Sequence, residues 1–282
     1  MSPATMTDFW SAVLDFARGI TTAVGIQLLT DFGQAQAIEK QDGSLVTQSD
    51  QWADLTLRSA ISQRFPDHGV LSEEVEHIFP TTEWCWVIDP LDGTTNFARG
   101  IPLWGISLGL LYRGTPVFGY VHFPPLQQSF HGFWSGESGL TGPTGAFLNQ
   151  KPIHSSTDAL TKNHFFNLCA RSISVLQQPF PCKIRMLGVA SYNFLLVAAG
   201  ATLGGVEATP KIWDLAGAWP IAQAAGATWV PLQSEPLFPL QPDLDYGDRS
   251  LPTLVVSRGE LVPIFCPLVQ SVAKPTYQYK SG

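Results

Sequence analysis

The sequence predicts a fold that mixes helices and strands, with a change of domain near residue 150. Three observations support this fold class. Apolar residues first recur at helical spacing, and in the middle of the chain they alternate with the period of a β-hairpin. Beyond residue 150, short strand and helix patterns follow one another, which is typical of α/β folds. We therefore expect two domains, residues 1–150 and residues 151–282.

Two helices are expected before the first long strand. Residues 8–32 carry apolar side chains every three or four positions, with Thr7 as the N-cap and Gly33 as the stop. Residues 51–64 repeat this spacing, and Asp50 stands at the start of the helix, where an acidic side chain suits the helix dipole. Each helix is expected to bury one apolar face.

Strands are expected where the apolar residues become compact or alternate. Residues 84–88 form an apolar run of β-branched and aromatic side chains. Residues 104–111 and 117–121 flank a turn at Arg113-Gly114, which predicts a hairpin with one buried face. The other expected elements are a strand at 130–134, helices at 190–200 and 214–225, and short strands at 204–206, 228–230 and 254–256.

The composition argues against several functional classes. The chain has 282 residues and a net charge of −7, which disfavours nucleic acid as the main partner because phosphate backbones are bound by Lys and Arg. No run of 18 apolar residues occurs, so no membrane association is expected. Four dispersed cysteines and the lack of a secretory signal favour reduced thiols in a cytoplasmic protein.

The negative charge is concentrated in one segment. Residues 65–98 hold seven of the 23 carboxylates and no Lys or Arg, which leaves 16 acids and 16 bases in the rest of the chain. Within this segment, an apolar strand runs into Asp89, and Pro90 ends regular pairing before Asp92. Two carboxylates held close together favour a cation between them, and Mg²⁺ suits oxygen ligands. The carbonyl of Leu91, freed from strand pairing, is a further candidate ligand.

A helix can begin directly after these carboxylates. The N–H groups of Gly93 and Thr94 would then favour an anion, typically a phosphate. A metal site beside a phosphate site indicates metal-assisted phosphoryl chemistry. The alternative is a surface turn, because D-P-x-D-G is ordinary turn chemistry. The apolar strand that approaches the turn favours a site.

Two further acidic positions are ambiguous by themselves. Glu73 and Glu74 lie 15–16 residues before Asp89, which leaves room for a turn and an antiparallel return. Asp214 opens an apolar helix, where it could equally be a helix N-cap.

Three motifs together resemble the inositol monophosphatase family of Mg²⁺-dependent, lithium-sensitive phosphatases. They are Leu71-Ser-Glu-Glu74, Trp86-Val-Ile-Asp-Pro-Leu-Asp-Gly-Thr-Thr-Asn-Phe97 and Trp213-Asp-Leu-Ala-Gly217. The resemblance implies a layered α-β-α-β-α sandwich. Its α+β half, with an antiparallel sheet, would carry most metal ligands, and its α/β half would supply Asp214 and the substrate pocket. Dimers are common in the family, so a homodimer is expected.

The resemblance implies a set of metal ligands and two or three Mg²⁺ ions, with Li⁺ as an inhibitor. Glu73, Asp89 and the Leu91 carbonyl would bind the first ion. Asp89, Asp92 and Asp214 would bind the second, and Glu73 would share a third.

The remaining implied roles concern catalysis and the substrate. Glu73 and Thr94 would activate a water for in-line attack on phosphorus, with Asp50 and Thr47 supporting Thr94. The substrate would be bound by the amides of Gly93 and Thr94, by the loop containing Gly188 and Ala190, and by Glu207.

The expected activity is hydrolysis of inositol 1-phosphate or a similar polyol or sugar phosphate, a small-molecule phosphate ester. The alternatives are a related phosphatase acting on histidinol phosphate, fructose 1,6-bisphosphate or a 3′-phosphoadenosine nucleotide, and a non-catalytic regulatory protein of the same fold. The chain departs from the family pattern at Ser72, Val189 and Thr209-Pro210-Lys211, and its stretch 156–185 is short. These departures leave the metal site intact but weaken any inference about the substrate.

Overall fold

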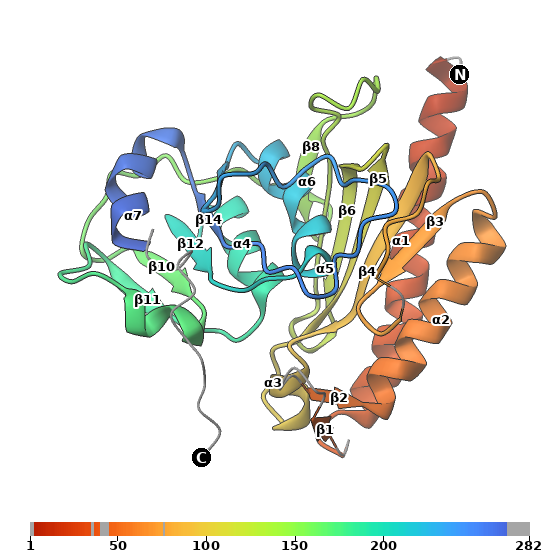
Figure 1. Ribbon diagram of the computed structural model, residues 1–282, viewed down its shortest axis with the longest axis horizontal. Helices are drawn as coiled ribbons and strands as arrows, with labels where there is room; N and C mark the ends of the chain where they lie inside the picture. The colour runs from red at the N-terminus through yellow and green to blue at the C-terminus, as the bar shows by residue number, and fades with distance from the viewer. Residues whose placement is uncertain (1–2, 35–36, 40–44, 76, 270–282) are drawn as a thin grey trace.

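The chain folds into five alternating layers of helices and sheets (Figure 1). The computed structural model describes residues 3–34, 37–39, 45–75 and 77–269. Helices α1 (Pro3–Asp31) and α2 (Gln48–Arg64) cover the outer face of a seven-stranded sheet. Three helices, α4 (Ala190–Ala198), α5 (Ile212–Ala216) and α6 (Ala218–Ala224), separate it from a five-stranded sheet, whose far face is covered by α7 (Val262–Val269). The expected α-β-α-β-α sandwich is therefore confirmed.

Helix α1 starts before the predicted N-cap, so Thr7 lies inside the helix rather than at its beginning. Gly33 follows the helix with a φ of 78°, as expected of a helix stop. Residues Met6–Asp31 are long and apolar enough to cross a membrane by length and composition, properties that core helices of soluble proteins also have. Val13 and Val24 of this helix are fully buried in the core shared with α2 and the seven-stranded sheet.

Helix α2 begins three residues earlier than predicted, because Thr47 supplies the N-cap. The Thr47 hydroxyl accepts hydrogen bonds from the amides of Ser49 and Asp50, while the Asp50 carboxylate accepts one from the Thr47 amide. This capping box fixes Asp50 in the first helical turn. Two short strands, β1 (Ala37–Glu39) and β2 (Leu45–Thr47), pair antiparallel just before α2.

The seven-stranded sheet has the strand order β3-β4-β5-β6-β7-β8-β9. Its strands are β3 (Gly69–Ser72), β4 (Trp84–Asp92), β5 (Gly105–Tyr112), β6 (Thr115–Phe123), β7 (Gln128–Phe133), β8 (Gly145–Leu148) and β9 (Lys151–Pro152). The predicted β5–β6 hairpin is present, but both of its faces are buried rather than one, because helices pack on both sides. Along β4, Trp86 and Ile88 face α1 and α2, whereas Cys85 and Val87 face the middle helices.

The predicted antiparallel return from Glu73 to Asp89 is wrong, because β3 and β4 run parallel. The chain between them crosses to the loop near residue 245, where Phe79 N–H donates to Leu244 C=O (2.9 Å). The parallel register pairs Ser72 with Ile88, so Glu73, the first residue after β3, lies beside Asp89, which is still paired with Ser107 of β5.

The five-stranded sheet has the order β11-β10-β12-β14-β13 and mixes parallel and antiparallel pairs. Its strands are β10 (Phe165–Leu168), β11 (Lys183–Arg185), β12 (Gly204–Glu207), β13 (Thr228–Pro231) and β14 (Thr253–Val256). The helix predicted at 214–225 begins earlier and is divided at Gly217 into α5 and α6. The division into domains at residue 150 stays a prediction.

The remaining elements are short. Helix α3 (Thr94–Ala98) follows β4, as the sequence predicted. Within the described residues, the 3₁₀ helices are η1 (Pro124–Leu126), η2 (Ala170–Val175) and η3 (Gly259–Leu261).

Candidate active site

The site is built on the end of β4. Pairing with β5 shifts register between Asp89 and Asp92, as the intervening proline predicted. The Asp89 carboxylate accepts a hydrogen bond from the Leu91 amide (3.0 Å), which holds the irregular turn together. Gly93 then adopts a φ of 95° at the start of α3, and a Cβ there would lie 2.8 Å from Val189 Cγ2. Glycine is thus required at this turn by both backbone conformation and space.

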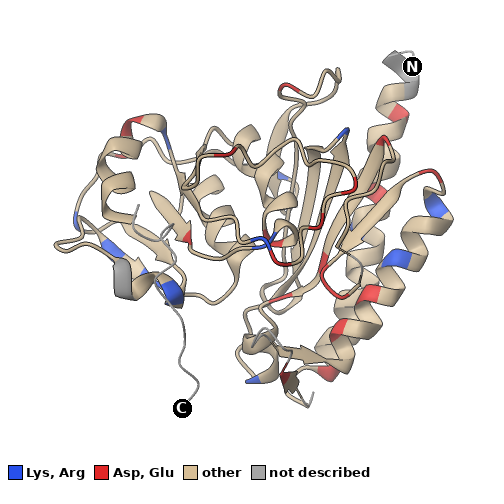
Figure 2. Ribbon diagram, in the orientation of Figure 1, with Lys and Arg blue, Asp and Glu red and all other residues tan. Residues whose placement is uncertain are grey.

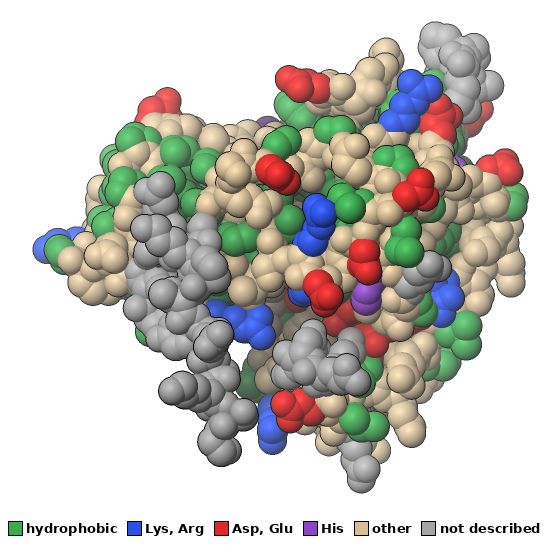
Figure 3. All heavy atoms as spheres, in the orientation of Figure 1, with side chains coloured by type: hydrophobic (Ala, Val, Ile, Leu, Met, Phe, Trp, Pro, Cys, Tyr) green, Lys and Arg blue, Asp and Glu red, His purple; other side chains and the backbone are tan. Residues whose placement is uncertain are grey.

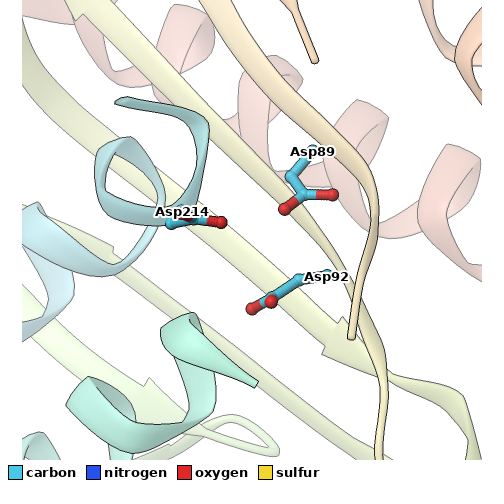
Figure 4. Close-up of side chains that lie close together, drawn as sticks. All are labelled: Asp89, Asp92 and Asp214. Atoms are coloured by element: carbon cyan, nitrogen blue, oxygen red, sulfur yellow. The ribbon is translucent and has the colours of Figure 1, made fainter. Parts of the chain in front are cut away.

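Three carboxylates from the two halves of the chain converge at this point (Figure 4). Asp89 and Asp92 come from β4 and Asp214 from α5, and each offers an oxygen within 4.8 Å of the others. Asp89 and Asp92 are buried, and Asp214 is partly buried. In Figure 4 the carboxylates of Asp89 and Asp214 turn toward each other, with that of Asp92 below them. A fourth carboxylate, Glu73, lines the same cleft.

Burial raises the pKa of Asp89 well above its usual value, and the charges of Glu73, Asp92 and Asp214 raise it further. The pKa of Asp214 rises for the same reasons, burial first and then Asp92. Such a cluster of oxygen ligands opposes its own ionisation without a cation and suits a hard divalent ion such as Mg²⁺. The donor set therefore fits the metal that the sequence led us to expect.

Asp214 also takes part in a helix cap, which was the alternative drawn from the sequence. Its carboxylate accepts a hydrogen bond from the Lys211 amide (2.6 Å), and Lys211 rather than Asp214 occupies the N-cap position of α5. The cap orients Asp214 at the start of the helix. A role of Asp214 in the helix cap is therefore compatible with a role as a metal ligand.

A hydrogen-bonded chain extends from the cleft to the first turn of α2. The Thr94 hydroxyl lies 3.0 Å from an Asp50 carboxylate oxygen and 3.0 Å from the Leu91 carbonyl oxygen. The other oxygen of Asp50 accepts hydrogen bonds from the hydroxyl (2.5 Å) and the amide (2.8 Å) of Thr47. Burial raises the pKa of Asp50, although these hydrogen bonds oppose the rise. The capping box of α2 thus positions the Thr94 side chain.

Most of the residues predicted from the sequence share one cleft of about 450 Å³ between the two sheets. Its lining includes Glu73, Asp89, Leu91, Asp92, Gly93, Thr94, Gly188, Ala190, Glu207 and Asp214. Thr47 and Asp50 are buried behind this lining. Figure 2 marks acidic positions on β4, α5 and β12, and Figure 3 shows acidic and basic side chains around a hollow between the halves.

The far wall of the cleft is formed by the ends of β12 and α4. Glu207 ends β12 and accepts a hydrogen bond from the Asn193 side-chain amide (2.6 Å). Burial raises the pKa of Glu207 to about 7. The Ala190 amide, expected to line a sugar pocket, donates to an Asp92 carboxylate oxygen (3.2 Å).

Several residues of the site escaped prediction from the sequence. Ser191 and Asn193 hold Asp92 and Glu207, and Arg171 reaches into the cleft while its guanidinium donates to the Thr209 hydroxyl (2.5 Å). Lys211 lines the cleft as well, and its ammonium group donates to the Gly247 carbonyl (2.5 Å). No local pattern marks these positions, because each contact joins segments that are far apart in the sequence.

Comparisons with known proteins agree with this geometry. The model of the inositol monophosphatase family matches residues 10–259. An inositol-1-monophosphatase of Synechocystis sp. is 33% identical over 227 residues, covering 76% of each chain. A histidinol-phosphatase of Chlorobaculum parvum is 29% identical over 225 residues, covering 76% of this chain and 83% of that protein. The solved structure of the Thermotoga maritima IMPase TM1415 matches with a TM-score of 0.77 at 26% identity, covering 93% of this chain and 98% of the other.

Proposed function

The chain belongs to the inositol monophosphatase family and is a phosphoric monoester hydrolase, and we propose that it hydrolyses inositol 1-phosphate or a similar polyol or sugar phosphate with Mg²⁺. The observation that carries this proposal is the buried cluster of Asp89, Asp92 and Asp214 beside the Thr94–Asp50 pair. We further propose two or three Mg²⁺ ions, inhibition by Li⁺, a homodimer and a cytoplasmic location, as the sequence led us to expect.

The cations would be held by carboxylate and carbonyl oxygens that line the cleft. Glu73, Asp89 and the Leu91 carbonyl would hold one ion, and Asp92 and Asp214 would join Asp89 around a second. When bound, divalent cations neutralise phosphate charge and lower the pKa of a water molecule.

Thr94 and Glu73 would orient the attacking water. A Thr94 hydroxyl that donates to Asp50 presents its oxygen lone pairs as acceptors, so the water can donate a hydrogen bond to Thr94. Glu73 lines the same cleft and would take up the proton of that water. The water would attack phosphorus on the side opposite the leaving alkoxide. The N–H groups of Gly93 and Thr94, at the start of α3, would donate to the phosphate oxygens.

The opposite wall would select the alcohol part of the ester. The carboxylate of Glu207 is held by Asn193 and can accept hydrogen bonds from substrate hydroxyl groups. A polyol offers several such hydroxyls, which supports a polyol or sugar phosphate as substrate.

A panel of phosphate esters tests the proposal. Phosphate release is measured with Mg²⁺ for inositol 1-phosphate, histidinol phosphate, fructose 1,6-bisphosphate and a 3′-phosphoadenosine nucleotide. We expect the highest kcat/KM for inositol 1-phosphate or another polyol phosphate. Preference for histidinol phosphate, fructose 1,6-bisphosphate or the nucleotide would overturn the substrate assignment. Hydrolysis of none of the esters would favour the non-catalytic alternative.

A further inference from the structure

Helix α4 has no side-chain cap from its own N-cap residue. Its N-cap residue is Val189, whose apolar side chain makes no capping hydrogen bond. The first N–H groups of a helix need acceptors, and an unsatisfied buried N–H is costly. Here the acceptor comes from β4, about 100 residues away in the sequence, because the Asp92 carboxylate faces the first turn of α4.

Three donors of α4 converge on this carboxylate. The Ala190 amide donates to Oδ1 (3.2 Å), whereas the amide (2.8 Å) and the hydroxyl (2.5 Å) of Ser191 both donate to Oδ2. Ser191 is fully buried, so its hydroxyl is shielded from competing water. Oδ2 is therefore committed to Ser191, while Oδ1, with one longer hydrogen bond, keeps more capacity for a cation.

We infer that Ser191 is a positioning residue for the metal centre: its hydroxyl fixes Asp92 so that the carboxylate presents Oδ1 to the cation. This inference rests on the proposed function, because it takes Asp92 as a metal ligand. Hydrogen bonds that orient a metal ligand typically change metal affinity 10–100-fold when they are removed. The amides of Ala190 and Ser191 would still donate to Asp92 after loss of the hydroxyl, so we expect the variant to fold.

The same helix also reaches the substrate wall. Asn193, two residues after Ser191, donates to Glu207 (2.6 Å). The first turn of α4 thus connects a proposed metal ligand with a proposed substrate ligand, because Ser191 donates to Asp92 and Asn193 donates to Glu207. Metal binding at Asp92 is therefore expected to stabilise the wall that holds Glu207.

Isothermal titration with Mg²⁺ in the absence of substrate tests the inference without relying on activity. We expect Ser191→Ala to weaken Mg²⁺ binding at least 10-fold, and the conservative variant Ser191→Thr to restore most of it. Ser257→Ala is the matched control, because Ser257 is equally buried and its hydroxyl has no partner among the described residues. This control should bind Mg²⁺ as the wild type does.

Asp89→Asn separates the two possible failures. If Asp89→Asn abolishes binding but Ser191→Ala leaves it unchanged, the inference about Ser191 is overturned while the proposed metal site stands. Unchanged binding by Asp89→Asn would overturn the metal site itself. Should the Ser191 variants fail to fold, the amide resonance of Ser191 in the wild type serves instead. It should shift on Mg²⁺ addition, and a resonance that stays still would overturn the inference.

Discussion

Replacing Asp89 by Asn should stabilise the metal-free protein and abolish its stabilisation by Mg²⁺. The oxygens of Asp89, Asp92 and Asp214 lie within 4.8 Å of one another. At an effective dielectric constant of about 20 and a separation of 4.8 Å, each fully ionised pair repels by about 3.5 kcal/mol, so the two pairs that involve Asp89 contribute about 7 kcal/mol when all three groups are ionised. Partial protonation of the cluster reduces this figure. We expect a gain of about 1–3 kcal/mol in the free energy of unfolding at pH 7.

The substitution is conservative in every other respect, since an Asn oxygen can still accept the hydrogen bond from the Leu91 amide. Thermal unfolding in a chelator and in Mg²⁺ measures the effect, and about 1 kcal/mol corresponds to a Tm change of roughly 2–4 °C for a protein near this size. Asp8→Asn, at an exposed position of α1, is the control and should change stability by less than about 0.5 kcal/mol.

The pH dependence of stability provides a second test of Asp89→Asn. Because the pKa of Asp89 is raised in the folded state, its stabilising contribution without metal is present at low pH and is lost as the pH rises above 3.8, the ordinary value. The wild type in chelator should therefore lose more stability than Asp89→Asn as the pH rises. A variant less stable than the wild type in chelator, or one still stabilised by Mg²⁺, would refute the reasoning.

Three further predictions concern other groups. Thr94→Ala should lower kcat by about 10²–10⁴-fold whereas Thr94→Ser keeps most activity, because only the hydroxyl bonds to Asp50; equal loss in both variants would argue against this role. The proposed contact of Glu207 with substrate hydroxyls needs its ionised carboxylate, and burial raises its pKa to about 7, so KM should fall as the pH rises through 7; in Glu207→Gln this dependence should vanish, and a KM of the wild type that does not change with pH would contradict the contact. Burial lowers the pKa of His68 to about 4, so the free energy of unfolding should decrease as the pH falls from 6.5 toward 4. In His68→Gln, the free energy of unfolding should depend less on pH over this range, and the same pH dependence as in the wild type would contradict this role of His68.

The sequence was most informative where the chemistry is local. An apolar strand, Pro90 between two acids, and Gly93 before a short helix are consecutive residues, so the turn at the end of β4 and the start of α3 could be predicted. The Thr47–Asp50 capping box is equally local, although it starts α2 earlier than the apolar spacing suggested. Both features depend on backbone and side-chain groups only three residues apart.

Predictions failed where distant segments decide the structure. The direction of β3 depends on the chain between Glu73 and Trp84, which pairs with the loop near residue 245, and no local pattern reveals that contact. The second buried face of the β5–β6 hairpin likewise exists only because α5 and α6 pack on it. The Ser191–Asp92 hydrogen bond, which joins residues 99 positions apart, was invisible for the same reason.

The central claim is that carboxylates from the two halves of the chain form one metal-dependent phosphatase centre, and Asp214 tests it most directly. Phosphate release from inositol 1-phosphate should be measured against Mg²⁺ concentration for the wild type and Asp214→Asn. We predict that the wild type requires Mg²⁺, and that the variant folds, since Asn can still accept from the Lys211 amide, but loses at least about 100-fold in kcat/KM. Full turnover in chelator, or a variant that is as active as the wild type, would leave Asp214 as a helix cap alone and contradict the account.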